Sequence, residues 1–172
     1  MSSSRYVVRR ARTADVAGIR SIVEAYSAER ILLGKDIVTL YEDVPDFRVA
    51  VAADGRVVGC GAVHVMWEDL AEVRTLAVLP KFRGQGIGQE VLDELLRTAV
   101  DLGVERVVCL TFEVEFFARH GFEVATSVQV DPEVFAQMVR SPDEGIAEYL
   151  DLERVRPNTL GNTRMVRFLR PQ

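Results

Sequence analysis

The stretch that decides the fold covers residues 76–88 and reads Leu76-Ala77-Val78-Leu79-Pro80-Lys81-Phe82-Arg83-Gly84-Gln85-Gly86-Ile87-Gly88. Its apolar beginning is typical of a buried strand, and its end opens the most regular amphipathic segment of the chain, residues 86–102. Glycine recurs at every second position from 84 to 88, which allows a tight turn and a close approach of the backbone to a ligand. We therefore predict a strand, a glycine-rich turn and a helix in succession.

This turn has the features of an anion site. The N–H groups of Gln85, Gly86, Ile87 and Gly88 would lie at a helix N-terminus, where the helix dipole favours negative charge. Arg83 adds a cation, and Lys81 adds one less directly. A diphosphate group fits this arrangement, while the alternative is a tight turn that needed glycine for its backbone alone. The spacing matches neither the dinucleotide-binding fingerprint nor the P-loop.

The rest of the chain alternates between the two periods of regular structure. Helical spacing or helix-ending glycines predict helices within 16–34 and over 36–41, 86–102, 113–120 and 132–139, the first with Thr13 as N-cap. Apolar runs and the Asp54-Gly55 turn predict strands over 6–10, 47–53, 57–66, 71–79, 106–110, from 122, and over 163–169. Residues 141–162 are charged and remain unassigned. This order predicts one α/β domain, residues 1–172, built on a mixed sheet.

Composition restricts the function classes. The chain has 172 residues, 48% of them hydrophobic, and a net charge of −5. This acidic balance argues against a broad nucleic-acid or membrane face. Cys60 and Cys109 lie in apolar runs, and the polar N-terminus is no secretory signal, so we expect a cytoplasmic protein. His64 and His120 have no ligands at zinc spacing, and we expect no metal.

Two motifs resemble a known family. Arg83-x-x-Gly86-x-Gly88 resembles the coenzyme A signature of the Gcn5-related N-acetyltransferases (GNAT), and the segment Phe116–Phe122 resembles their closing aromatic segment. The resemblance implies a mixed central sheet with flanking helices, in which the fourth and fifth strands, here 72–79 and 106–110, splay apart. It implies that residues 83–88 bind the pyrophosphate of acetyl-CoA, that Leu76, Ala77 and Val78 pair with its pantetheine arm, and that Phe117 lies in the cofactor site.

Within this family the chain is most similar to the acetyltransferase domain of the N-acetylglutamate synthases. The similar segments are 8–11, 29–33, 72–78, and 110–111 followed by 116–117. This implies transfer of an acetyl group to the α-amine of glutamate or glutamine, the first step of arginine biosynthesis, by a homodimer. The long synthases also carry an amino-acid-kinase domain, for which 172 residues leave no room, so the resemblance does not extend to arginine feedback that depends on that domain.

The resemblance also implies catalytic roles. Glu72 stands where family members often place a base for the amine, and on a strand it would share one face with Arg74 and Leu76. The alternative is a surface glutamate paired with Arg74. The N–H near Leu76 would stabilise the oxyanion, and Thr111 would offer a hydroxyl to the substrate. Phe117 replaces a tyrosine acid, so the thiolate must leave unprotonated or take its proton elsewhere.

A dicarboxylate acceptor needs cations, which arginine supplies best because its planar fork binds a carboxylate with two hydrogen bonds. The candidates are Lys35 and Arg74, with Arg10 and Arg164 weaker, and each could instead be a solvated surface charge. Glu113 beside the acceptor would repel a side-chain carboxylate, which favours glutamine. Two other interpretations stay open: a GNAT enzyme for another small amine or a protein N-terminus, and a non-catalytic acyl-CoA-binding module.

Overall fold

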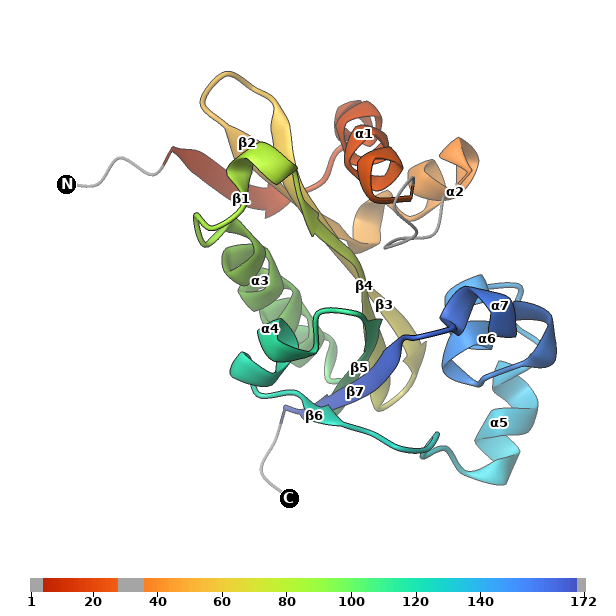
Figure 1. The fold of residues 1–172 in the computed structure, drawn as a ribbon. Helices are drawn as coiled ribbons and strands as arrows, with labels where there is room; N and C mark the ends of the chain where they lie inside the picture. Colours follow the sequence, from red (N-terminus) through yellow and green to blue (C-terminus); the bar gives the residue numbers. More distant parts are fainter. Residues whose placement is uncertain (1–4, 28–35, 170–172) are drawn as a thin grey trace. The chain divides into compact units, whose positions relative to one another are not determined.

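The computed structural model describes residues 5–27 and 36–169 (Figure 1). Its strands are β1 (Tyr6–Arg10), β2 (Phe47–Ala52), β3 (Val57–Trp67), β4 (Leu70–Val78), β5 (Arg106–Thr111), β6 (Glu123–Val124) and β7 (Thr163–Phe168). Its α-helices are α1 (Val16–Ser27), α2 (Ile37–Glu42), α3 (Ile87–Leu102), α4 (Val114–Arg119), α5 (Pro132–Met138), α6 (Glu144–Tyr149) and α7 (Arg156–Thr159). Short 3-10 turns are η1 (Thr13–Asp15), η2 (Val44–Asp46), η3 (Pro80–Phe82) and η4 (Glu153–Val155).

The seven strands follow the order β1-β2-β3-β4-β5-β7-β6 in one sheet. Pairing is antiparallel between β1 and β2, β2 and β3, β5 and β7, and β6 and β7. β4 and β5 are parallel, and their register covers Leu70–Glu72 against Arg106–Val108. Beyond that register β5 continues to Thr111 in partnership with β7. The predicted mixed sheet with splayed fourth and fifth strands is confirmed.

Two compact units divide the described residues. The first comes from Met1–His64 and Thr75–Ala99, and the second from Val65–Arg74 and Val100–Gln172. Strands β3 and β4 each contribute residues to both units. That residues 1–172 form a single domain stays a prediction.

In the first unit, β3 presents side chains of different size to its two faces. Cys60 and Ala62 belong to a core with the apolar face of α1 and with Phe47 and Val49 of β2. On the other face, a Cβ atom at Gly61 would come within 2.9 Å of Leu95 and one at Gly59 within 2.7 Å of Ile87. Glycines at these two positions therefore let α3 lie directly on the strand, which fixes the N-terminus of α3.

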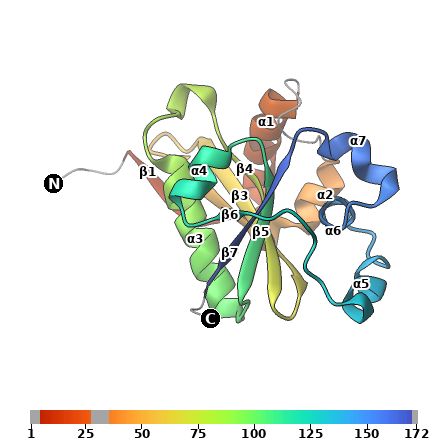
Figure 2. The same ribbon diagram turned by 60° about the horizontal axis from the view of Figure 1, so that its bottom comes forward.

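In the second unit, α5 and α6 lie to one side of the strands (Figure 2). Met138 of α5 and Ile146 and Tyr149 of α6 form a core with residues of β3, β4 and β5, namely Met66, Leu70 and Val108. α6 lies within residues 141–162, the range that the sequence leaves unassigned. A helix this short has little intrinsic stability, so tertiary packing holds it, and packing leaves no periodic signal in a charged segment.

The first helix begins differently from the prediction. Thr13 does not cap α1, because residues 13–15 form the turn η1, and the Asp15 carboxylate instead accepts the N–H of Arg12 at 2.7 Å. α1 ends at Ser27, and the predicted extension toward Gly34 lies outside the described residues. In the described part of the chain no helix combines the length and apolarity that crossing a membrane requires.

Candidate functional site

The glycine-rich turn has the backbone geometry expected of an anion site. Gly84 and Gly86 have φ angles of 78° and 81°, which side chains disfavour, and a Cβ atom at either would meet nothing within 4 Å. The first hydrogen bond of α3 runs from the N–H of Glu90 to the C=O of Gly86. Because N–H groups of a first helical turn have no acceptor within the helix, those of Ile87 and Gly88 suit an external anion. Gln85 is exposed in the same turn.

The strand before this turn is held at its end by an aromatic side chain. The hydroxyl of Tyr26, on α1, donates to the C=O of Val78, and the N–H of Leu79 donates to the C=O of Val58 at 2.8 Å. Arg83 places its guanidinium 5.8 Å from the centre of the Tyr26 ring. One buried tyrosine therefore contacts both the end of β4 and the cation of the turn. Leu76 and Ala77 precede Val78 and are half-buried.

Thr75 interrupts the alternation of β4. Its φ of 57° lies in the left-handed region, which a β-branched residue rarely adopts. The prediction that Glu72, Arg74 and Leu76 share one face by strict period two therefore does not extend across Thr75. Glu72 and Arg74 do lie together, since their side chains form an ion pair.

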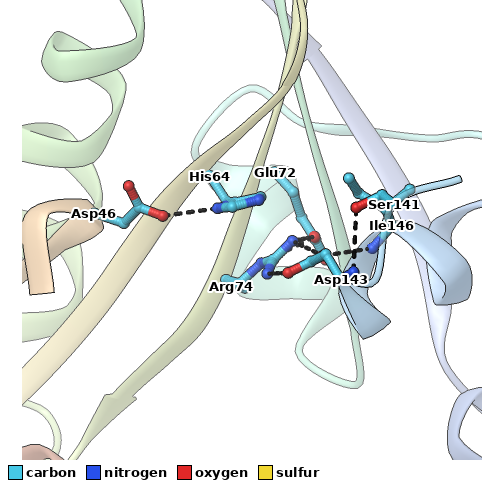
Figure 3. A network of polar contacts seen from close by, with 7 residues as sticks. All are labelled: Asp46, His64, Glu72, Arg74, Ser141, Asp143 and Ile146. Carbon is cyan, nitrogen blue, oxygen red and sulfur yellow. Dashed lines mark hydrogen bonds and ion pairs between the residues drawn. The ribbon is translucent and has the colours of Figure 1, made fainter. Parts of the chain in front are cut away.

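Glu72, Arg74 and Asp143 form a partly buried network in the second unit, in which the Asp143 side chain is 22% exposed (Figure 3). Arg74 donates to Glu72 Oε2 from Nη2 at 2.6 Å, and to Asp143 from Nη1 at 2.8 Å and Nη2 at 2.9 Å. Burial opposes the charge of Arg74, but the two carboxylates outweigh it and raise the pKa of the guanidinium. The Glu72–Arg74 pairing matches one of the two interpretations of the sequence, although Glu72 is 5% exposed and not a surface residue.

Buried Cys109 lies next to this network on β5. Burial raises the pKa of its thiol, and the negative charge of Glu72 raises it further. Cys109 therefore stays a neutral thiol at physiological pH, as expected of a structural cysteine.

Three of the predicted site residues lie at the end of β5 and in the segment that follows it. Thr111 ends β5, is buried, and accepts the N–H of Glu113 on its hydroxyl oxygen at 2.8 Å. Glu113 is exposed just before α4. Phe117 is 6% exposed, with the rings of Phe116 and Phe122 edge-on at 5.2 and 5.1 Å. A cofactor contact of Phe117 stays a prediction, while its aromatic packing is established.

The predicted acceptor cations differ in what they contact. Arg164 on β7 donates from Nη2 to the C=O of Tyr149 at 2.7 Å, and its guanidinium lies 5.5 Å from the centre of the Tyr149 ring. Its Nε is buried and, among the described residues, has no hydrogen-bond partner. Arg10 ends β1 and is exposed. Lys35 and the segment 29–33 lie outside the described residues.

The polar contacts that were not predicted from the sequence include two carboxylate pairs (Figure 3). In the first unit His64 Nδ1 lies 2.7 Å from Asp46 Oδ2 (Figure 3). In the second, Asp143 pairs with Arg74 across 69 residues of sequence. Only the fold brings such partners together, so no local pattern could have signalled either pair. In the described ranges no group of His, Cys, Asp and Glu side chains could hold a metal ion.

Comparison with known proteins assigns the family. The profile of the acetyltransferase (GNAT) family matches residues 19–122, more than half of the chain. The chain belongs to the acetyltransferase (GNAT) family. This confirms the resemblance predicted from Arg83-x-x-Gly86-x-Gly88 and the prediction of an acetyltransferase.

Relatives of this GNAT chain share its sequence or its fold. An amino-acid acetyltransferase of Mycobacterium tuberculosis is 56% identical over 167 residues, 96% of this chain and 95% of that protein. The crystal structure of Rv2747 from Mycobacterium tuberculosis in complex with CoA and NLQ has a TM-score of 0.91 at 55% identity, covering 94% of this chain and 98% of that one. N-acetylglutamate synthase from Neisseria gonorrhoeae, complexed with CoA and N-acetyl-glutamate, has a TM-score of 0.77 at 23% identity, covering 99% of this chain and 36% of that one. The Rv2747 structure is a complex with CoA, in agreement with the predicted acetyl-CoA dependence.

Proposed function

We propose that this chain transfers the acetyl group of acetyl-CoA to the α-amine of glutamate or glutamine, the step that opens arginine biosynthesis. The observation that carries the proposal is the 56% identity, over nearly the whole chain, to a protein named amino-acid acetyltransferase. The fold shared with a complex of CoA and N-acetyl-glutamate supports it at longer range.

Residues of the first unit would bind acetyl-CoA. The turn from Arg83 to Gly88 would bind the pyrophosphate through N–H groups at the start of α3 and through the Arg83 guanidinium. The backbone of Leu76, Ala77 and Val78 would pair with the pantetheine arm as an added strand. The N–H of Leu76 would donate to the thioester oxygen as negative charge develops there. The open space above Gly84 and Gly86 fits such a ligand.

Residues of the second unit would bind the amino acid and take the proton from its amine. Glu72 would take the proton that the α-ammonium must lose before its nitrogen attacks the thioester carbon. The Thr111 hydroxyl would donate to the amino acid while its oxygen keeps the bond from Glu113. Phe117 has no proton to give, so the CoA thiolate would leave as such or be protonated by water.

Recognition of the acceptor's carboxylates calls for cations. Arg164 is the best-supported candidate among the described residues, because its buried Nε–H has no acceptor from the chain there. A buried N–H donor without a hydrogen-bond partner is unfavourable. A carboxylate of the amino-acid substrate would accept a hydrogen bond from it. Lys35 remains a predicted second cation. Repulsion of a side-chain carboxylate by Glu113 would make glutamine as good a substrate as glutamate, or better.

Competition between acceptors tests the proposal. The purified chain is incubated with acetyl-CoA and an equimolar mixture of glutamate, glutamine, ornithine and lysine, and the acetylated products are identified by mass spectrometry. We expect N-acetylglutamine and N-acetylglutamate with the acetyl group on the α-nitrogen. Acetylated ornithine or lysine alone would assign the chain to another acceptor, and CoA binding without any product would leave a non-catalytic module.

A further inference from the structure

Arg74 was predicted as a ligand for the acceptor's carboxylate. In the structure, its N–H groups donate hydrogen bonds to carboxylates of the chain itself. Nε and Nη2 donate to Glu72 Oε2 at 3.1 and 2.6 Å, while Nη1 and Nη2 donate to the two oxygens of Asp143. The Arg74 side chain is 10% exposed and that of Glu72 7%. These four hydrogen bonds use four of the five N–H donors of the guanidinium, so a substrate could accept at most one hydrogen bond, from Nη1, without displacing a carboxylate of the chain.

Asp143 is itself fixed by the helix that follows it. Its Oδ1 accepts the N–H of Ile146 at 2.8 Å, which caps α6, and its own N–H donates to Ser141 Oγ at 3.1 Å. Ile146 and Tyr149 anchor α6 in the core of the second unit. The carboxylate that holds Arg74 is therefore attached to an anchored element.

Gly145 shows how closely α6 approaches the ion pair. A Cβ atom at Gly145 would lie 2.5 Å from Arg74 Nη2 and 2.9 Å from Glu72 Oε2, closer than van der Waals contact allows. This glycine is helical and has no positive φ, so close approach and not backbone conformation requires it. The backbone of α6 thus lies directly against the guanidinium and Glu72 Oε2, so no ligand fits between Gly145 and these two groups.

We propose that Arg74 is a positioning residue: it holds the carboxylate of Glu72 in place, and Asp143 and Gly145 of the α6 region hold Arg74, so that Arg74 acts on the reaction through Glu72 and not by binding the acceptor. This inference rests on the proposed function, in which Glu72 is the base. It also assigns a role to Asp143 and Gly145, in a segment that carries no catalytic motif: these two residues hold the guanidinium that orients the base.

The test compares kcat with the acceptor KM in four variants. Arg74→Lys removes the planar fork but keeps the charge, and Asp143→Asn removes one carboxylate. Glu144→Gln, an exposed neighbour in α6, is the control for Asp143→Asn, and Arg20→Lys, in an exposed pair with Glu24, is the control for Arg74→Lys. We expect R74K to lower kcat about 100-fold, as misplacement of a base does, while the acceptor KM changes less than about twofold. D143N should lower kcat in the same way but less, and both controls should leave it unchanged.

The R74K substitution is also made in a Glu72→Gln variant. This distinguishes an effect of Arg74 on the position of Glu72 from general damage to the structure. In Glu72→Gln the base is absent, so adding R74K should lower kcat no further, whereas independent structural damage would multiply the two losses. A rise of the acceptor KM of tenfold or more in R74K, with kcat preserved, would overturn the proposal, because Arg74 would then bind the acceptor. A fall of the acceptor KM in D143N would also overturn it, because Asp143 would then merely occupy the substrate's place.

Melting temperatures and urea titrations accompany these assays. If R74K fails to fold, D143N against E144Q carries the kinetic test. If the wild type acetylates neither glutamate nor glutamine, the proposed function fails. The urea midpoints of E72Q, R74K and the double variant then test, without any activity, whether Arg74 holds Glu72. Non-additive midpoints support the coupling of Glu72 and Arg74, whereas additive midpoints contradict it.

Discussion

Asp15 keeps its charge although it is 7% exposed. Arg9 donates to its two carboxylate oxygens at 2.7 and 3.0 Å, and the N–H of Arg12 donates at 2.7 Å. The hydrogen bonds from Arg9 lower the pKa of Asp15, which burial opposes and the Arg12 N–H supports. A carboxyl whose pKa is lower in the folded state stabilises the fold above its unfolded pKa, and that stabilisation is lost as the pH falls through the folded pKa.

Asp15→Asn should therefore destabilise the chain in a pH-dependent way. At pH 7 we expect a loss of about 1–3 kcal/mol, because charge-assisted hydrogen bonds become neutral ones. The difference in melting temperature from the wild type should shrink as the pH falls below about 4, where the unfolded carboxyl is protonated. Asp54→Asn, in an exposed hairpin pair with Arg56, is the control and should change little. Equal differences at pH 7 and pH 3 would contradict this account of Asp15.

Glu113 is the residue that we expect to set the preference between the two acceptors. Replacing it with glutamine removes a negative charge near the site proposed for the acceptor's side chain. The ratio of kcat/KM for glutamate over glutamine should rise about fivefold, the effect of about 1 kcal/mol of repulsion between solvated charges. Glu115→Gln, exposed on the next turn, is the control. An unchanged ratio in E113Q would remove Glu113 from substrate selection.

Residue roles divide into those that spacing predicts and those that depend on the fold. The pairing of Glu72 with Arg74 follows from period-two spacing in a strand. The partner that completes it, Asp143, is 69 residues away, and the φ of Thr75 breaks the alternation that the spacing assumed. Arg74 was predicted to bind the substrate because the sequence shows its positive charge. The sequence does not show that the carboxylate of Asp143 pairs with it in the folded chain.

At the scale of elements, the turn before α3 carries the most testable geometry. Gly86 has a φ of 81° and open space where a Cβ would be, so Gly86→Ala should cost about 1 kcal/mol of backbone strain and place a methyl group in the predicted pyrophosphate site. Gly55, at the β2–β3 hairpin, has a φ of 87° and equally open surroundings, so Gly55→Ala is a matched control for strain.

Calorimetric titration with CoA separates the two variants. Both should lose similar stability, but only G86A should bind CoA more weakly, by about tenfold or more because one backbone approach is blocked. Equal CoA affinity in G86A and G55A would contradict the assignment of residues 83–88 to the pyrophosphate.

Elements with strong local signals were predictable from sequence. The stripe of Ile87, Val91, Leu92, Leu95 and Leu96 predicted α3, and Asp54-Gly55 predicted the hairpin between β2 and β3. α6 and α7 were not predicted, because they are short and charged. Packing of Ile146 and Tyr149 and the capping carboxylate of Asp143 hold α6, and these depend on tertiary structure.

At the scale of the molecule, the sequence predicted the mixed sheet because motif and element order agreed. It did not predict that the described residues divide into two compact units, each with its own buried cluster. The boundary between the units crosses β4 between Arg74 and Thr75, after the pairing of β4 with β5 has ended at Glu72 and Val108.

Assembly is a further prediction at this scale. The family resemblance implies a homodimer, which light scattering behind a sizing column measures directly. We expect about twice the chain mass of 19.2 kDa at concentrations used in the assays. A mass of one chain across that range would remove dimerisation from the account.

The central claim is that the chain acetylates glutamate or glutamine, and release of the CoA thiol tests it most directly. Initial rates are measured with acetyl-CoA and glutamate, glutamine, ornithine, lysine or no acceptor at equal concentration. The account predicts release that depends on glutamine or glutamate and falls about 100-fold or more in Glu72→Gln, the contribution expected of a general base. Tight binding of CoA with no release above the acceptor-free rate for either amino acid would contradict it.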